Sequence, residues 1–220
     1  MAKVIIANAE GGNYVVNGTG EFRIEKANIT VKPKDISKVY GSEPEFELES
    51  DSDLITAEQL AAFANSTEFA SEGTAKNAKV EAGGYEITAV LTQNETKNLV
   101  LAVSGTGTLT VLPAKLTIQV NDVSRIYGEP NPALSVSYNG FVNGENESVL
   151  NGTLVLAYSE SINETTAVDT YENVTMASGL TSGNYDITYV PGNVTITKIP
   201  VRASAGRQEE LISTLCWIRA

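Results

Sequence analysis

Histidine is absent from this chain of 220 residues, and cysteine and tryptophan each occur once. Without histidine, the chain cannot build a Ser-His-Asp or Cys-His catalytic arrangement or bind zinc through imidazole. The single cysteine, Cys216, cannot form a disulfide within a domain or a cysteine-rich zinc site. A glycine-rich phosphate loop of the Walker type is also missing. We therefore expect no catalytic residues, no cofactor and no metal.

Positive charge and long apolar runs are scarce as well. Lysine and arginine number 15 against 27 aspartates and glutamates, which gives a formal net charge of −12. Because the phosphate backbone of nucleic acid is bound mainly by positive charge, we expect no nucleic-acid partner. No stretch approaches the roughly 20 apolar residues that a membrane-spanning helix needs, so we expect no direct membrane insertion of this segment.

Aspartate and glutamate, which can act as catalytic acids and bases, are plentiful in the chain. Paired carboxylates hydrolyse glycosides, but such a site needs a deep cleft, and a domain of fewer than about 90 residues seldom forms one. We therefore interpret the acidic composition as a solvated surface that keeps the chain soluble. The sequence predicts a protein that is not an enzyme.

What the chain does contain is an internal repeat. Residues 27–41, ANITVKPKDISKVYG, recur as residues 114–128, AKLTIQVNDVSRIYG, at an offset of 87. Residues 18–27 and 105–114 match at the same offset. Tandem copies of a small domain build length and multivalent surface more often than one active site. The identical pairs in the first block are Ala27/Ala114, Thr30/Thr117, Asp35/Asp122, Ser37/Ser124, Tyr40/Tyr127 and Gly41/Gly128.

The period divides the chain into four segments. A strand-pair pattern near the end of each repeat occurs three times, and we take Tyr14, Tyr85 and Tyr185 as its equivalent positions. The last segment leaves the pattern and holds the only tryptophan and cysteine, so it is treated as an atypical tail. The predicted segments are a C-terminal remnant of a preceding repeat (1–27), repeat domain 1 (28–113), repeat domain 2 (114–199) and the tail (200–220).

Each repeat alternates in a way that predicts strands, one short helix and further strands. Residues 115–120 alternate apolar and polar side chains with the period of a half-buried strand. Thr56 and Gln59 fit a capping box before an alanine-rich stretch, and a second short helix is expected around 145–150. The predicted fold is mainly β or α+β, with tandem β-grasp-like repeats that each carry one short helix. An immunoglobulin-like β-sandwich, which has about seven strands and no central helix, is the alternative.

Two groups of aromatic residues are candidate sites. Tyr40-Gly41 and Tyr127-Gly128 are predicted to be a structural motif, in which glycine permits a sharp reversal and tyrosine buries its ring and bonds its hydroxyl. A sugar-binding surface would instead need exposed aromatic rings beside polar side chains. The possible ligand contacts of that kind are Tyr138, Phe141 and Tyr158.

Two stretches of the second repeat carry a family resemblance. DVSRIYGEPNPALSVSYNGFVNGE, followed by SGNYDITYVPGNVTITK, resembles the MBG domain of the YGX type. Residues 28–113 and 114–199 resemble whole copies, and residues 1–27 a partial one. The first copy departs from the pattern, because SEPEFE follows its Tyr-Gly and residues 91–104 form an insertion.

The resemblance implies a cellular location for the chain and does not imply a chemical reaction. The family consists of tandem modules in large bacterial and archaeal cell-surface proteins and adhesins, so it implies an extracellular location and brings no catalytic residues. Our leading hypothesis is a non-enzymatic structural or adhesive repeat module, a stalk, whose parent protein contacts host or cell-surface glycans or proteins. A carbohydrate- or mucin-binding module is the alternative.

Overall fold

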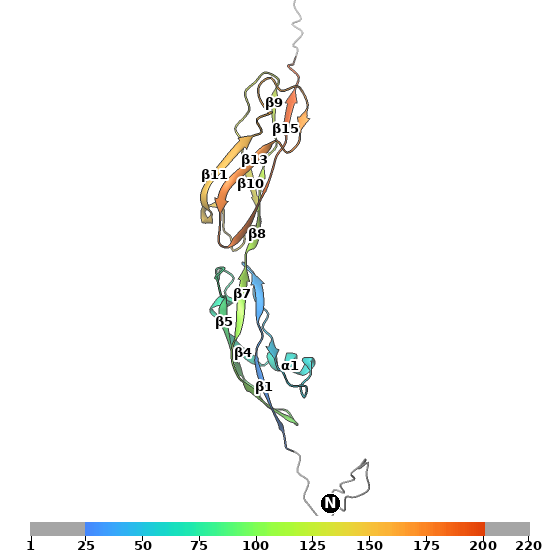
Figure 1. Ribbon diagram of the computed structural model, residues 1–220, viewed down its shortest axis with the longest axis vertical. Helices are drawn as coiled ribbons and strands as arrows, with labels where there is room; N and C mark the ends of the chain where they lie inside the picture. Colours follow the sequence, from blue (N-terminus) through green and yellow to red (C-terminus); the bar gives the residue numbers. More distant parts are fainter. Residues whose placement is uncertain (1–24, 201–220) are drawn as a thin grey trace, which may run out of the picture. The chain divides into compact units, whose positions relative to one another are not determined.

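The computed structural model describes residues 25–200, shown in colour in Figure 1. The chain divides into two compact units between Leu112 and Pro113. Nearly all of the predicted remnant (1–27) and of the predicted tail (200–220), with Tyr14 and Cys216, lies outside the described residues. Within the described part, no helix is long and apolar enough to cross a membrane.

The first unit is a set of short strands with a single α-helix. Its sheets have the strand orders β3-β1-β6 and β2-β7-β5-β4. In chain order, its elements are β1 (Ala27–Pro33), β2 (Ile36–Val39), β3 (Leu48–Glu49), α1 (Ala57–Ala64), β4 (Thr67–Ala70), the 3-10 turn η1 (Glu72–Thr74), β5 (Tyr85–Leu91), β6 (Leu99–Val103) and β7 (Gly107–Leu112).

The second unit uses the same plan with a different middle part. Its sheets have the orders β10-β8-β14, β12-β15-β9 and β11-β13. In chain order, its elements are β8 (Ala114–Val120), β9 (Val123–Ile126), β10 (Val136–Asn139), the 3-10 turn η2 (Glu147–Val149), β11 (Asn151–Tyr158), β12 (Thr170–Tyr171), β13 (Thr175–Thr181), β14 (Tyr185–Val190) and β15 (Val194–Thr197).

The first and last strands of each unit lie side by side and run parallel. β1 pairs with β6 and β2 with β7, while β8 pairs with β14 and β9 with β15. We call these paired strands the terminal ribbon of each unit. The prediction of a mainly β or α+β fold is confirmed, and the first and last strands of each unit pair in parallel. The sandwich alternative is built of two antiparallel sheets, whereas β1 and β8 each lie between a parallel and an antiparallel neighbour.

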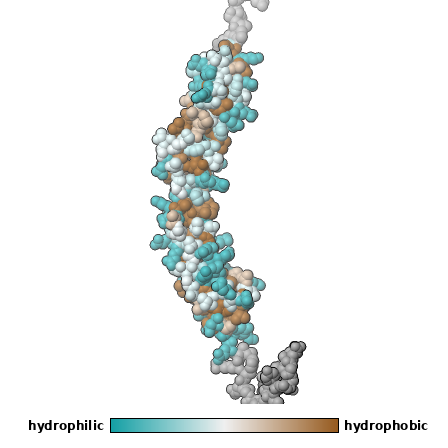
Figure 2. All heavy atoms as spheres, viewed as in Figure 1, coloured by the Kyte–Doolittle hydropathy of each residue, from teal (hydrophilic) through white to brown (hydrophobic). Residues whose placement is uncertain are grey.

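Alternating burial along the strands gives each unit its own interior. In β8, every second side chain is buried, beginning with Ala114 and ending with Val120. Burying one such aliphatic side chain contributes about 1.5–3 kcal/mol. Figure 2 shows the outer surface of both units, where small brown hydrophobic patches lie among polar atoms. The main buried cluster of the first unit is Ile29, Val31, Leu48, Ile55, Phe63, Leu99 and Leu101, and a cluster in the second unit is Ile162, Val194 and Ile196.

The predicted helix of the first repeat is present, together with its capping box. The Thr56 hydroxyl accepts a hydrogen bond from the Gln59 backbone N–H at 3.3 Å. The Gln59 side chain in turn accepts one from the Thr56 N–H at 2.9 Å. Phe63 at the far end of α1 is buried in the cluster beneath it. Capping and the apolar packing of Leu60, Phe63 and Ala64 therefore fix this short helix on the sheet.

The short helix predicted in the second repeat is present only as a three-residue 3-10 helix. Only the 3-10 turn η2 lies in the expected segment, capped by the Asn146 side chain, which accepts from Ser148 N–H at 2.9 Å. Asn143 and Gly144 just before it have φ of 57° and 72°, so the chain reverses here instead of continuing as a helix. The stretch also lacks the alanines that favour α1. Among the described residues, an α-helix therefore occurs in the first unit, and the second unit has a 3-10 helix in the matching segment.

The capping box should be measurable as local stability. Thr56→Ala removes the hydroxyl that accepts from Gln59 N–H, and we expect α1 to lose about 1 kcal/mol of protection. Hydrogen exchange of the α1 amides measures this loss. Thr56→Ser keeps an acceptor and is the control, with protection near that of the parent chain. Equal protection in Thr56→Ala and the parent would contradict a capping role.

Candidate functional site

In both units, the ladder of the terminal ribbon is interrupted between its two strand segments, and a carboxylate bridges the interruption. Between β1 and β2, Asp35 accepts a hydrogen bond from Thr108 N–H at 2.7 Å. Between β8 and β9, Asp122 accepts one from Asn193 N–H, also at 2.7 Å. In both units, the carboxylate thus holds the start of the last strand. This explains why aspartate recurs at these positions of the repeat.

A glycine lies beside each break, where the two strands approach closely. A Cβ added at Gly107 would lie 2.7 Å from the Pro33 carbonyl oxygen, and one at Gly192 would lie 2.5 Å from the Val120 carbonyl oxygen. Neither contact can be relieved by turning a side chain, because the obstructing atom is backbone. Glycine is therefore required by space and not by φ at these two positions.

The Tyr-Gly motif ends the second strand of each ribbon. Gly41 has φ of 93° and Gly128 has φ of 85°, the left-handed region that glycine adopts without penalty. The backbone N–H groups of Tyr40 and Tyr127 continue the ribbon, donating to Leu112 and Thr197 carbonyls at 2.8 and 2.9 Å. The rings differ, since Tyr40 is buried whereas Tyr127 is 40% exposed. The expected burial of the ring is therefore wrong for Tyr127.

A buried cation occupies the same place in both units. Lys38 and Arg125, 87 residues apart, are only 4% and 5% exposed. The Lys38 ammonium donates to the Thr74 carbonyl at 3.2 Å and to the Ala75 carbonyl at 2.5 Å. Burial lowers the pKa of Lys38, and the Glu43 carboxylate opposes part of this effect. The first unit therefore holds an amine in a setting that disfavours its charge.

Arg125 uses the longer reach of its guanidinium. Its Nε donates to Asn131 Oδ1 at 2.9 Å, its Nη1 donates to the Ile126 carbonyl at 3.3 Å, and its Nη2 donates to the Asn163 carbonyl. The arginine thereby ties the loop after β11 to β9. The burial of these two cations was not predicted from the sequence. A signal was present, because Lys38 faces the same side of its strand as Ile36 and the buried Tyr40.

The buried lysine predicts a pH effect of known sign. Because its pKa is lower in the folded than in the unfolded chain, the unfolded chain binds more protons between the two values. The contribution of Lys38 to stability therefore rises as pH increases from below the folded pKa towards the ordinary value of 10.5. In Lys38→Met this rise should be missing, as measured by urea unfolding of both chains from about pH 7 to pH 11. Lys97→Met, which removes a charge at an exposed position, is the control, and identical pH profiles for Lys38→Met and the parent would refute the effect.

The strand pairings correct one equivalence drawn from the sequence. Ala27 lies opposite Leu99, and its counterpart Ala114 lies opposite Tyr185. The structural counterpart of Tyr185 is therefore Leu99, and the expected equivalence of Tyr185 with Tyr85 is wrong. The two tyrosines lie on strands of opposite direction, since β14 runs parallel to β8 whereas β5 runs antiparallel to β7.

The true counterpart of Tyr85 is Tyr171. Tyr85 lies opposite Leu109, and Tyr171 lies opposite Val194, the matching position of the second unit. Both tyrosines precede glutamate in the sequence. Their hydroxyls also act alike, because Tyr85 donates to the Lys79 carbonyl at 2.8 Å and Tyr171 to the Ala167 carbonyl at 3.2 Å. Each tyrosine thus holds the loop that leads into its own strand.

Two of the three possible ligand contacts lie together. The rings of Tyr138 and Phe141 are 5.6 Å apart, and Phe141 meets the buried Tyr185 edge-on at 5.4 Å. The Tyr185 hydroxyl donates to the Glu145 carboxylate at 2.5 Å. Burial raises the pKa of Tyr138, with a smaller contribution from Glu147. The aromatic pair is thus partly covered and has a carboxylate beside it.

Tyr158 is separate from that pair. Its ring belongs to the cluster around Ile162 and Val194, and its hydroxyl donates to the Pro132 carbonyl at 2.7 Å. Burial raises the pKa of Tyr158, and the Arg125 charge lowers it in part. The three residues therefore do not form one surface.

Two shallow hollows complete the candidate sites. One, of about 510 Å³ in the first unit, is lined by carboxylates that include Asp35, Glu43 and Glu47. Glu47 pairs with Lys34 at 2.6 Å and Glu43 with Lys76 at 3.2 Å, so these carboxylates lie in surface ion pairs. No group of three His, Cys, Asp or Glu side chains suited to a metal ion occurs within residues 25–200.

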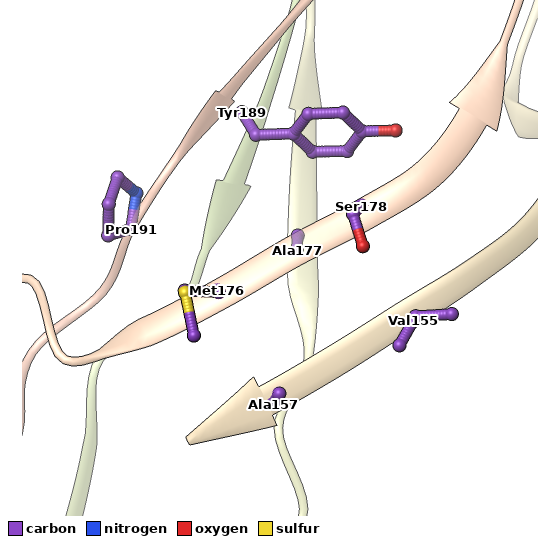
Figure 3. A pocket seen from close by; sticks show the side chains of 7 residues that line it. All are labelled: Val155, Ala157, Met176, Ala177, Ser178, Tyr189 and Pro191. Atoms are coloured by element: carbon purple, nitrogen blue, oxygen red, sulfur yellow. The ribbon is translucent and has the colours of Figure 1, made fainter. Parts of the chain in front are cut away.

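The other hollow, of about 370 Å³, is an apolar surface of the second unit (Figure 3). Val155 and Met176, which line it, are each 54% exposed. None of its lining side chains is charged, so it offers apolar area and no acid or base. A signal for this hollow lies in the sequence, because TLVLAY (153–158) is apolar in both strand phases. Its lining residues are Val155, Ala157, Met176, Ala177, Ser178, Tyr189 and Pro191.

The comparison with protein families bears on the second unit. The family model of the MBG domain (YGX type) matches residues 116–195, from within β8 to within β15. The second unit is an MBG domain. Asp122, Arg125 and most of the terminal ribbon lie inside the matched range. No curated protein matches the chain.

Proposed function

We propose that the chain is a non-enzymatic structural module of a cell-surface protein, in which successive MBG units hold a distal binding part away from the cell. The MBG match suggests a repeat module of a surface protein. We further propose that the first unit is a diverged copy of the second, and that both lie outside the cell.

The observation that carries this proposal is the shared framework. Aspartate, buried cation, close-approach glycine and Tyr-Gly recur at matching places of both terminal ribbons. What differs is the middle part, where the helix α1 precedes the β4–β5 pair in one unit and only the 3-10 turn η2 precedes the longer β11–β13 pair in the other. Selection on a common active site would instead retain a common set of side chains at one surface position. A retained framework with variable surface suits a spacer.

Surface location and spacing can be tested separately. Antibodies raised against residues 114–199 should label intact cells of the source organism, and labelling that requires permeabilised cells would refute the surface location. For spacing, a fluorescent reporter is displayed on a cell through one or two copies of the full chain. Its distance from the membrane, measured by nanometre localisation, should increase with copy number. An unchanged distance would refute the spacer role.

Glycan binding is the second candidate function. The half-buried Tyr138 and Phe141 rings with the neighbouring Glu145 carboxylate favour it, because sugar rings stack on aromatic faces beside polar groups. Partners would then be host or cell-surface glycans, bound weakly by each unit and strongly by an array. A glycan array probed with the parent chain and with Tyr138→Ala tests this. Binding that is lost in the variant supports it, and the absence of binding by an array of several copies refutes it.

A further inference from the structure

The path of the chain through each unit has a mechanical consequence. The second unit begins at Ala114, opposite Tyr185, and its last strand ends at Thr197, opposite Ile126. Entry and exit therefore lie at opposite ends of the same terminal ribbon, as the positions of β8 and β15 within this unit show (Figure 1). The first unit is alike, with entry at β1 beside β6 and exit at β7 beside β2.

Tension between entry and exit would act along these strands. The two strands of a parallel pair would slide past each other, and their hydrogen bonds, which are evenly spaced, would carry the force together. Peeling the same strands apart from one end would break the bonds one after another at a much lower force. We propose that the terminal ribbon of each unit is a clamp that resists tension applied along the chain.

The hydrogen bonding of the ribbon extends from entry to exit in two ladder segments with a break between them. In the second unit, residues 114–119 pair with 185–190, and residues 123–126 pair with 194–197. At the break between these two segments, where a ladder would be weakest, Asp122 accepts from Asn193 N–H at 2.7 Å. Asp35 does the same for Thr108 in the first unit. The recurring aspartate therefore joins the two halves of the clamp.

The ribbon is also shielded from water on its inner side. Leu116, Ile118 and Val194 are 0% exposed, and Ile196 is 2% exposed. Water cannot replace a stretched hydrogen bond on that side until the strands have moved. The bonds therefore break in one cooperative event, which raises the barrier to unfolding under force.

This inference deepens the proposed function and rests on it for its biological purpose, since a spacer between a cell and a bound target is pulled from both ends. The mechanical property itself is measured on the isolated chain. A weak ribbon would refute the clamp and leave surface labelling unaffected. Absence of surface labelling would refute the location and leave the clamp intact.

The decisive experiment pulls the same strands in two directions. Optical tweezers are attached to the full chain carrying Cys216→Ser and two exposed attachment sites. Lys115→Cys with Lys198→Cys loads the ribbon along its length, whereas Glu129→Cys with Lys198→Cys loads it from one end. We expect a rupture force several-fold higher in the first pair. Equal forces in the two directions would overturn the proposal.

A second measurement isolates the aspartate. Asp122→Ala removes one side-chain hydrogen bond of the clamp, and Asn146→Ala removes one outside it. We expect Asp122→Ala to unfold about fivefold faster at a given lengthwise force, the effect of one hydrogen bond, and Asn146→Ala to unfold at the parent rate. Asp122→Asn, which keeps an acceptor, should fall between them. Equal acceleration in Asp122→Ala and Asn146→Ala would overturn the role of the break.

Discussion

Gly192→Ala is expected to destabilise the second unit by roughly 2–3 kcal/mol. The added methyl group would lie 2.5 Å from the Val120 carbonyl oxygen, 3.0 Å from Thr175 Oγ1 and 3.1 Å from the Asn121 carbonyl oxygen. Thr175 is fully buried, and its hydroxyl bonds with the backbone of Gly192 at 2.8 and 3.0 Å. Relief of the clash therefore requires β8 and its neighbour to separate.

Gly183 provides the matched control for this substitution. Nothing lies within 4 Å of a Cβ added there, and its φ is outside the positive range. Gly183→Ala should therefore leave stability unchanged or raise it by up to about 1 kcal/mol, because alanine restricts the unfolded chain. Hydrogen exchange of residues 114–126 in increasing urea reports on the second unit alone. Equal midpoints for the two variants would contradict the close approach at Gly192.

Arg125→Ala is expected to cost roughly 2–4 kcal/mol. Removal of the guanidinium leaves the Asn131 amide oxygen and the Asn163 carbonyl without their donor. It also leaves a cavity, because the Arg125 side chain is buried and only 5% exposed. The loop after β11 would also lose its tie to β9. The loss should appear in the second unit and leave the protection of the first unit unchanged.

Arg125→Lys should be milder, because the first unit holds Lys38 at the matching position through backbone carbonyls alone. Lys115→Ala, at an exposed position of β8, is the control for the loss of one positive charge and should change stability by less than about 0.5 kcal/mol. Urea unfolding followed by hydrogen exchange of β9 measures all three. A loss in Arg125→Ala no larger than in Lys115→Ala would refute the stabilising role of the buried guanidinium.

The parts of the fold that could be predicted are those with a local cause. The alternation of apolar and polar side chains predicted β1 and β8. The Thr56 capping box and the alanines that follow it predicted α1. The recurrence of Asp35 and Asp122 was visible, but its purpose was not. A carboxylate that accepts from a backbone N–H 73 residues later leaves no trace in its own neighbourhood.

The pairing of strands was harder to predict from the sequence than the strands themselves. NYDIT and GYEIT look alike, yet Tyr185 lies on a parallel strand and Tyr85 on an antiparallel one. Alternation reports which face of a strand is buried and does not report the direction of its neighbour. The offset between matching residues is 87 at Lys38 and Arg125 and 86 at Tyr85 and Tyr171, because the connecting loops differ in length. A period fixed on the first strands therefore misplaces the later ones.

The candidate site was predictable only in part. Tyr138 and Phe141 do lie together, whereas the core position of Tyr158 follows from its contact with Ile162 in a long loop that no pattern defines. The buried cations broke the usual expectation that lysine and arginine lie outside. Their burial is compensated by carbonyl groups from distant loops, which only the folded chain brings near.

The two forms of the middle part show how much of a unit can change while its terminal ribbon stays the same. The same ribbon carries the helix α1 and the short β4–β5 pair in the first unit, and the 3-10 turn η2 and the longer β11–β13 pair in the second. A change of the middle part would therefore alter the outer surface of a unit and leave the terminal ribbon, with its aspartate, buried cation and close-approach glycine, unchanged.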